Sequence, residues 1–366
     1  MCYLYKLFME QEKIKKIQER LKKEKLDAFL ISSPSNIFYL TGLRGDLKER
    51  EFLLNISRDG WEIIVPEMYF LEAKRKIANF SATKERGGLF LKAIEGLKNY
   101  KRIGFEKNDL KYGEYENLSR NLSSGKLFPT SGFCEDLRKV KDKKEIGLIK
   151  KAVEIADKTF YTTLKIIKPG LSEKFIQRKI IEIMEDLGAE GPAFLPIVAS
   201  GKGSAEPHHI SSNKKIKKGE ILLIDMGARC KGYCSDLTRT IFIGKASREF
   251  KKTYNLVLET QKMAIKNCQA GYPIKTLYQD AVLNFEEYGE EKKFIHNLGH
   301  GVGINAHEFP SIGPRAEGRF ENGMLITIEP GLYYKNFGGV RIEDLCFIDQ
   351  KCKSLSKAAR KIIEIK

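Results

Sequence analysis

The sequence contains no long apolar run. A membrane-spanning helix needs roughly 20 consecutive apolar residues, and no stretch of the 366 residues comes near that length. The opening Met1–Phe8 is apolar but too short for a signal-peptide core, and no small-residue cleavage site follows it. We therefore expect no membrane attachment. We expect a disordered extension at residues 1–8, followed by a helix over Glu10–Lys25.

Cysteines are few and irregularly placed. The chain has seven, an odd number, and no regular spacing links them. Cys230 and Cys234 are close in sequence, but no nearby cysteine or histidine completes a zinc-binding pattern, so we interpret them as packing residues. A disulfide framework is not expected, and the pattern favours a reducing, cytoplasmic location.

Acidic residues are too few to balance the basic ones. The net charge of +17 could indicate a nucleic-acid-binding surface. However, the lysines are scattered in pairs such as Lys217-Lys218 and Lys251-Lys252, and no basic stripe interleaved with aromatic residues occurs. An ordinary surface rich in lysine explains the charge, and we expect no nucleic-acid partner.

The chain is long enough for two domains. The first third alternates expected strands and helices, has no cluster of histidine or cysteine, and is predicted to be an α/β domain at residues 9–137. A charged stretch, Arg138–Glu145, marks the start of the second domain at residues 138–366. The elements expected in the first domain are strands at Leu26–Ser32 and Arg102–Glu106, a hairpin over Glu51–Val65 that turns at Asp59-Gly60, and a helix at Lys111–Leu122.

The second domain carries an internal repeat of helices. A long helix is followed by a shorter one in each copy, and the spacing from Gly170 to Gly188 equals that from Gly271 to Gly289. Glycine suits helix ends because it accepts the left-handed conformation. The expected helices lie at Ile146–Ile167, Ser172–Leu187, 249–270 and Ile274–Tyr288.

The repeat continues into the strands. Gly219-Glu-Ile-Leu-Leu-Ile-Asp225-Met-Gly227 parallels Gly323-Met-Leu-Ile-Thr-Ile-Glu329-Pro-Gly331. A second strand then carries a second carboxylate, Asp236 in the first copy and Glu343 in the second. Two such units facing each other across a pseudo-two-fold axis would bring four carboxylates to one centre.

These carboxylates need cations. Asp225 and Glu329 each end an apolar strand, where an unpaired acid costs several kcal/mol. Arg341 is one expected partner, but four carboxylates with an imidazole suit two divalent metal ions better. The oxygen-rich ligand set favours Mn²⁺, with Co²⁺ or Zn²⁺ as alternatives. All five histidines lie in the second domain, and a purely structural role stays open for His209.

Several motifs resemble the proline-specific peptidases of the pita-bread fold. This family includes aminopeptidase P, which removes a residue preceding proline, and prolidase, a dipeptidase. The resemblance covers most of residues 145–350, and Ser33–Gly42 is similar to the family's amino-terminal domain. The motifs are Phe194–Gly201, Pro207-His208, Asp225-Met-Gly-Ala, Ser235–Thr240, His296–Gly303, His307-Glu308, Ile328–Gly331 and Val340–Asp344.

The resemblance implies a two-domain fold, with an α/β creatinase-like amino-terminal domain and an α+β pita-bread catalytic domain containing the pseudo-two-fold repeat. It also implies a homodimer that acts on peptides with proline at the second position. The implied ligands of the two metal ions are Asp225, Asp236, His300, Glu329 and Glu343.

Individual roles follow from the same resemblance. Asp225 would bind one ion, His300 and Glu329 the other, and the two remaining acids would bridge them. A bridging hydroxide would be the nucleophile, with Glu329 as general base. His208 and His307 would contact the scissile carbonyl. His296 would lie on the substrate-binding side, and Arg341 would orient a ligand carboxylate.

The sequence favours an Xaa-Pro aminopeptidase over an Xaa-Pro dipeptidase. A dipeptidase must bind the carboxylate of its product proline, for which a basic side chain is suited. Prolidases of similar length tend to carry arginine after His-Glu-x-Pro, whereas Ser311 stands here; Arg315 or Arg319 could substitute. Methionine aminopeptidases usually lack the amino-terminal domain. Non-catalytic binding modules and creatinase-like amidinohydrolases of this fold lack the full ligand set.

Overall fold

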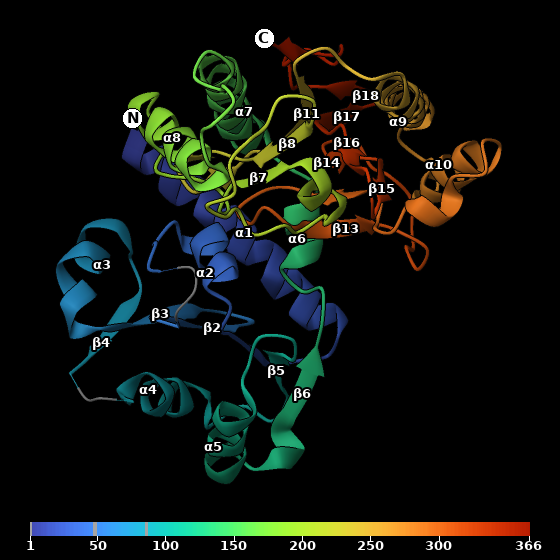
Figure 1. Ribbon diagram of the computed structural model, residues 1–366. Helices are drawn as coiled ribbons and strands as arrows, with labels where there is room; N and C mark the ends of the chain where they lie inside the picture. The colour runs from blue at the N-terminus through green and yellow to red at the C-terminus, as the bar shows by residue number, and fades with distance from the viewer. Residues whose placement is uncertain (1, 47–49, 85–86) are drawn as a thin grey trace. The chain divides into compact units, whose positions relative to one another are not determined.

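The computed structural model describes residues 2–46, 50–84 and 87–366. The chain forms two compact units, residues 1–137 and 138–366 (Figure 1). The division falls at the start of the charged stretch from which the sequence placed the domain boundary. None of the described helices is long and apolar enough to cross a lipid bilayer.

The first unit is built on a six-stranded mixed sheet with the order β4-β3-β2-β1-β5-β6. The predicted hairpin is confirmed, because β2 and β3 pair antiparallel with Leu53 opposite Ile64. The strands are β1 (Ala28–Ile31), β2 (Leu53–Ser57), β3 (Trp61–Pro66), β4 (Phe80–Thr83), β5 (Ile103–Glu106) and β6 (Leu127–Thr130). The helices are α1 (Cys2–Lys23), α2 (Pro34–Thr41), α3 (Phe70–Lys76), α4 (Gly88–Leu97), α5 (Tyr112–Leu122) and α6 (Glu135–Lys139).

The first helix is longer than predicted. Residues 2–8 are helical rather than a disordered extension, because α1 starts at Cys2, and Met1 lies outside the described residues. No glycine or proline interrupts residues 2–23, so nothing in this segment breaks a helix. The predicted apolar face is buried, since Ile14, Ile17 and Leu21 are at most 2% exposed.

The second unit confirms the internal repeat. Each copy contains two helices followed by strands, and Figure 1 shows α7 and α8 on one side of the strands and α9 and α10 on the other. The four helices are α7 (Lys143–Leu164), α8 (Glu173–Asp186), α9 (Arg248–Asn267) and α10 (Ile274–Glu286).

The strands of the second unit form two main sheets. Their orders are β19-β11-β8-β7 in the first copy and β13-β12-β14-β17-β18 in the second. The first contains β7 (Ile197–Ser200), β8 (Ile221–Met226), β11 (Leu237–Ile243) and β19 (Glu364–Ile365). The second contains β12 (Gly299–Gly301), β13 (Glu308–Ile312), β14 (Leu325–Ile328), β17 (Asp344–Asp349) and β18 (Lys351–Ser354). Two short hairpins are β9 (Arg229–Cys230) with β10 (Tyr233–Cys234), and β15 (Gly331–Tyr334) with β16 (Gly338–Arg341).

Local sequence explains the helix ends. α7 begins three residues earlier than predicted because the Asp142 side chain caps it, accepting hydrogen bonds from the Lys144 and Glu145 amides. Gly188 and Gly289 follow α8 and α10 with φ of 90° and 70°, so the predicted left-handed residues end both copies of the shorter helix.

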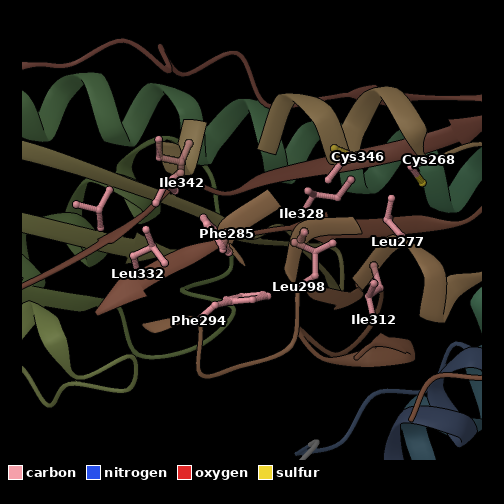
Figure 2. Close-up of a cluster of buried hydrophobic side chains, with 14 of the residues drawn as sticks. Cys268, Leu277, Phe285, Phe294, Leu298, Ile312, Ile328, Leu332, Ile342 and Cys346 are labelled. Atoms are coloured by element: carbon pink, nitrogen blue, oxygen red, sulfur yellow. The ribbon is translucent and has the colours of Figure 1, made fainter. Parts of the chain in front are cut away.

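Each helix pair is held on its sheet by a separate hydrophobic cluster. In the first copy Phe160 and Ile180 of the helices pack with Ile224 of β8. In the second, Leu277 and Phe285 of α10 belong to one cluster with Ile328 of β14 (Figure 2). The strands that carry the predicted carboxylates are therefore fixed from behind by close packing.

Candidate metal centre

The four predicted carboxylates stand at the ends of paired strands. In the first copy Asp225 lies in β8 and Asp236 directly precedes β11; these strands pair antiparallel, with Thr238 opposite Asp225. In the second copy Glu329 directly follows β14 and Glu343 directly precedes β17, with Ile328 opposite Asp344. Each strand pair thus brings its two acids to the same end. The acids of both copies interact electrostatically.

His300 joins the acids from β12. Its Nε2 atom lies 3.2 Å from Glu329 Oε1 and 3.8 Å from Asp236 Oδ2. Asp236, His300 and Glu343 each offer a ligand atom within 4.8 Å of those of the other two. One metal ion could therefore contact all three residues after small side-chain adjustments.

Two glycines let β12 approach its neighbours. A Cβ atom on Gly299 would lie 2.0 Å from the Thr327 carbonyl oxygen, and one on Gly301 would lie 2.2 Å from the Phe309 carbonyl oxygen. Both contacts are with backbone, which cannot move aside. The glycines on either side of His300 are thus required by packing and fix the position of the imidazole.

Arg341 neutralises one of the acids. Its Nη2 donates to Asp225 Oδ2 at 2.6 Å, its Nη1 to the Tyr333 hydroxyl at 3.0 Å, and its Nε to Thr238 Oγ1 at 3.2 Å. Arg341 is only 3% exposed, so this pair is shielded from water. The other oxygen of Asp225, Oδ1, is buried and has no hydrogen-bond partner.

The directions of the pKa shifts indicate a deficit of positive charge at the centre. Burial and the neighbouring acids raise the pKa of Asp236 and of Glu343 well above their ordinary values. Burial would also raise the pKa of Glu329, but its hydrogen bond with His300 and nearby positive charge lower it to about 2. Burial opposes the charge on His300, yet Glu329 raises the His300 pKa.

Divalent ions fit this deficit. Arg341 and His300 could offset two of the four carboxylates, and burial with the neighbouring acids raises the pKa of the other two, Asp236 and Glu343. The unpaired Oδ1 of Asp225 offers a free lone pair for a metal ion. Four carboxylates and one imidazole form a donor set for hard or borderline divalent metals. The residues present therefore suit the ligand set that the sequence predicted.

Two threonines missed by the sequence analysis orient the acids. Thr327 Oγ1 accepts from the His300 amide at 3.0 Å and donates to Glu329 Oε1 at 2.9 Å. Thr238 Oγ1 donates to Glu343 Oε2 at 2.7 Å. Each threonine stands two residues from a predicted ligand, at the spacing that places side chains on the same face of a strand. That spacing is the signal that could have identified them.

Tyr333 was also missed, and it links Arg341 to His296. The His296 Nδ1 atom lies 2.7 Å from the Asn297 carbonyl oxygen, and its Nε2 lies 2.8 Å from the Tyr333 hydroxyl. Burial lowers the pKa of His296, which favours the neutral ring. In that state Nδ1 donates to the carbonyl and Nε2 accepts from Tyr333, whose oxygen accepts from Arg341. A strand tyrosine carries no sequence signal for such a role.

The remaining predicted histidines lie beside the centre. The His307 ring centroid is 4.1 Å from that of His300, and burial lowers the pKa of His307. His208 is exposed and interacts electrostatically with His296 and His307. The loop that carries His208 is held because the Pro207 carbonyl accepts from Arg341 Nη1 at 3.3 Å.

His209 has a different environment. Its Nε2 atom lies 3.0 Å from Oε2 of Glu173, whose side chain is fully buried, and its Nδ1 lies 3.4 Å from Glu206 Oε2. These contacts tie the loop to the start of α8 rather than to the metal centre. The structural role left open for His209 in the sequence analysis matches this position.

Comparison with known proteins identifies the family. The model of "Metallopeptidase family M24" matches residues 147–350, more than half of the chain. The chain belongs to metallopeptidase family M24. The first unit fits this assignment, because the "Creatinase/Prolidase N-terminal domain" model matches residues 13–140. This M24 peptidase is therefore a metal-dependent hydrolase with the two-domain architecture that the sequence predicted.

Several relatives match this M24 peptidase over nearly its whole length. An Xaa-Pro dipeptidase of Pyrococcus horikoshii is 38% identical over 357 residues, covering 96% of this chain and 99% of the relative. The solved Xaa-Pro dipeptidase from Bacillus anthracis has a TM-score of 0.92 at 31% identity, covering 97% of this chain and 99% of that one. The solved X-Pro aminopeptidase from Thermotoga maritima has a TM-score of 0.84 at 32% identity, covering 94% and 100%.

Proposed function

We propose that this M24 peptidase is an Xaa-Pro dipeptidase. The supporting observation is a centre of four carboxylates and His300 in a chain that matches a named Xaa-Pro dipeptidase over 96% of its length. The aminopeptidase preferred from the sequence rested on Ser311, and the names of the relatives favour the dipeptidase alternative instead. The X-Pro aminopeptidase neighbour, 32% identical, keeps the aminopeptidase as the second candidate.

The centre would hold two divalent ions through the five predicted ligands. Mn²⁺ suits the oxygen-rich set best, and Co²⁺ or Zn²⁺ could replace it. Bound ions would polarise the scissile carbonyl and lower the pKa of water. A homodimer and a cytoplasmic location complete the proposal; they rest on the family resemblance and on the cysteine pattern.

The protein's own side chains would accept the proton from water and position the substrate. Glu329 Oε1 accepts a hydrogen bond from Thr327 at 2.9 Å, which would orient the carboxylate to accept a proton from water. His208 and His307 flank the centre and would donate hydrogen bonds to the carbonyl oxygen as negative charge develops on it. Tyr333 and Arg341 would hold His296 on the substrate side.

Dipeptide and tripeptide substrates separate the two candidates. With Mn²⁺ present, kcat/KM for Met-Pro is expected to exceed that for Met-Pro-Ala by roughly 10- to 100-fold, because a charged hydrogen bond to the terminal carboxylate contributes about 1.5–3 kcal/mol. Met-Pro-amide, which lacks that charge, serves as the control and should behave like the tripeptide. A tripeptide cleaved as well as Met-Pro would favour the aminopeptidase. If Met-Pro is the better substrate, Arg315→Met tests whether Arg315 binds its terminal carboxylate.

The adjacent histidines provide a matched pair of variants. His208→Ala is expected to lower kcat by roughly 10²–10³-fold while leaving metal content and Tm unchanged, the usual scale for removing one transition-state donor. His209→Ala should leave kcat nearly unchanged but reduce the free energy of unfolding by about 1–3 kcal/mol, because buried Glu173 loses a partner. Steady-state kinetics, metal analysis and urea unfolding distinguish them. The assignment of this loop is wrong if His209→Ala causes the larger loss of kcat.

A further inference from the structure

Three cysteines that the proposed mechanism does not use gather in the second unit. Cys268 follows α9, Cys346 lies in β17 and Cys352 lies in β18, and their exposed fractions are 1%, 0% and 8%. Cys268 and Cys346 both interact with Cys352 closely enough to raise their own pKa values. Figure 2 shows Cys268 and Cys346 at one end of the hydrophobic cluster to which α9 and α10 contribute.

The backbone places Cys268 directly opposite Cys352. Gln269 and Lys351 form an antiparallel bridge, and the Cys352 amide donates to the Cys268 carbonyl at 3.1 Å. Only this one backbone hydrogen bond joins the two residues, because the Cys268 amide donates to the Ala264 carbonyl at 3.0 Å. Residues opposed across an antiparallel hydrogen bond have Cα atoms about 5.5 Å apart. Disulfides join Cα atoms roughly 4.4–6.8 Å apart. The pair therefore has a spacing that a disulfide can bridge without backbone movement.

Cys346 is placed less well for the same bond. Its partner in the β17–β18 register is Ser354, two residues beyond Cys352. Such a diagonal pair has Cα atoms about 7–8 Å apart, beyond the usual disulfide range. The Cys346 thiol donates to the Asp344 carbonyl at 3.7 Å, so Cys346 is a neighbour of Cys352 but not its covalent partner.

Cys352 is the reactive member of the group. The neighbouring thiols lower the pKa of Cys352, against the opposing effect of burial. The thiolate is the nucleophilic form of cysteine, so Cys352 reacts first. Cys352 also lies in β18, an edge strand of its sheet, and is the most exposed of the three cysteines.

We propose that Cys268 and Cys352 are a redox modification site that forms a reversible disulfide on reaction with a hydroperoxide. The Cys352 thiolate attacks the terminal oxygen of the hydroperoxide, which breaks the O–O bond, forms a sulfenic acid and releases an alcohol, or water from hydrogen peroxide. The Cys268 sulfur then attacks the Cys352 sulfur, and water leaves with the second proton. Two thiols are oxidised by two electrons, and the hydroperoxide is reduced. Cellular thiols reverse the reaction by exchange.

The bond would tie the end of α9 to the sheet that carries three of the five proposed metal ligands, His300, Glu329 and Glu343. β18 pairs with β17, whose first residue follows Glu343. A cross-link between segments so distant in sequence restricts the unfolded chain strongly, which should raise Tm by roughly 5–10 °C for a domain of this size.

Non-reducing peptide mapping tests this directly. The Mn²⁺-loaded full chain is treated with hydrogen peroxide, and the expected result is a Cys268–Cys352 cross-linked peptide, a higher Tm, and reversal of both by dithiothreitol. Cys352→Ala should abolish the cross-link and the Tm shift, whereas Cys346→Ala should retain the cross-link and slow its formation. Cys134→Ala, a buried cysteine in the first unit, is the matched control and should behave like the wild type.

Other outcomes overturn the proposal. Free thiols at Cys268 and Cys352 after peroxide treatment would do so, as would a cross-link that joins Cys346 or the Cys230/Cys234 pair instead. Mapping of the wild-type chain gives this answer even if a variant folds poorly.

Discussion

Glu329→Gln is expected to lower kcat by roughly 10³-fold or more. The substitution keeps the size of the side chain and an oxygen that Thr327 can donate to, but it removes the charge that accepts a proton and pairs with His300. A general base contributes about 10²–10⁴-fold on its own. Glu329 is also a proposed metal ligand, so the metal content of the variant should fall as well.

Asp157→Asn is the matched control for this experiment. Asp157 is a buried carboxylate in the same unit, 7% exposed, and it accepts hydrogen bonds from the backbone amides of Lys357 and Ala358. Its replacement should cost about 1–2 kcal/mol of unfolding free energy and leave kcat within about two-fold. A Glu329→Gln variant with kcat within ten-fold of the wild type would show that Glu329 is not the base.

Arg341→Met is expected to reduce the unfolding free energy of the metal-free protein by about 3–5 kcal/mol. Arg341 is buried and holds the Asp225 carboxylate at 2.6 Å, and removing one partner of such a pair leaves an uncompensated charge in the interior. The variant also loses the hydrogen bonds to Tyr333 and Thr238. Urea unfolding in the presence of chelator measures the effect, which Mn²⁺ should reduce because it offsets the same charge.

The double variant Arg341→Met/Asp225→Asn separates charge from packing. If the unpaired carboxylate causes the loss, removing its charge should restore a large part of the stability that the single variant lost. A double variant less stable than Arg341→Met would instead mean that the hydrogen bonds of Arg341 dominate. Lys139→Met, which removes a surface ion pair with Glu321, should change stability by less than about 1 kcal/mol.

The repeat made the cluster of carboxylates predictable from sequence. Asp225 and Glu329 each follow an apolar run at the same distance from a glycine, so their strands, and therefore their neighbours, could be aligned before any coordinates were known. The same pattern indicated the helix pairs that pack behind them. The register of the antiparallel pairs then places Asp236 at the same strand end as Asp225, and Glu343 at the same strand end as Glu329.

What the sequence did not reveal depends on contacts between distant segments. Tyr333 acquires its role only because His296 and Arg341 meet at its hydroxyl. The opposition of Cys268 and Cys352 arises from a bridge between the end of α9 and the start of β18, two segments with no shared pattern. The early start of α1 is a different kind of miss, because it concerns a local pattern. Residues 2–8 are apolar and contain no helix breaker, yet they were interpreted as a disordered extension. Substrate specificity could not be predicted from a local pattern either. Ser311 alone suggested an aminopeptidase, which the names of the relatives support less well than a dipeptidase.

Metal content measured together with activity tests the central claim most directly. Protein loaded with Mn²⁺ and dialysed free of excess metal should contain about two ions per chain, as in other two-metal hydrolases. Removal by a chelator should abolish hydrolysis of Met-Pro, and added Mn²⁺ should restore it. Full hydrolysis of Met-Pro by protein that elemental analysis shows to be metal-free would contradict the account.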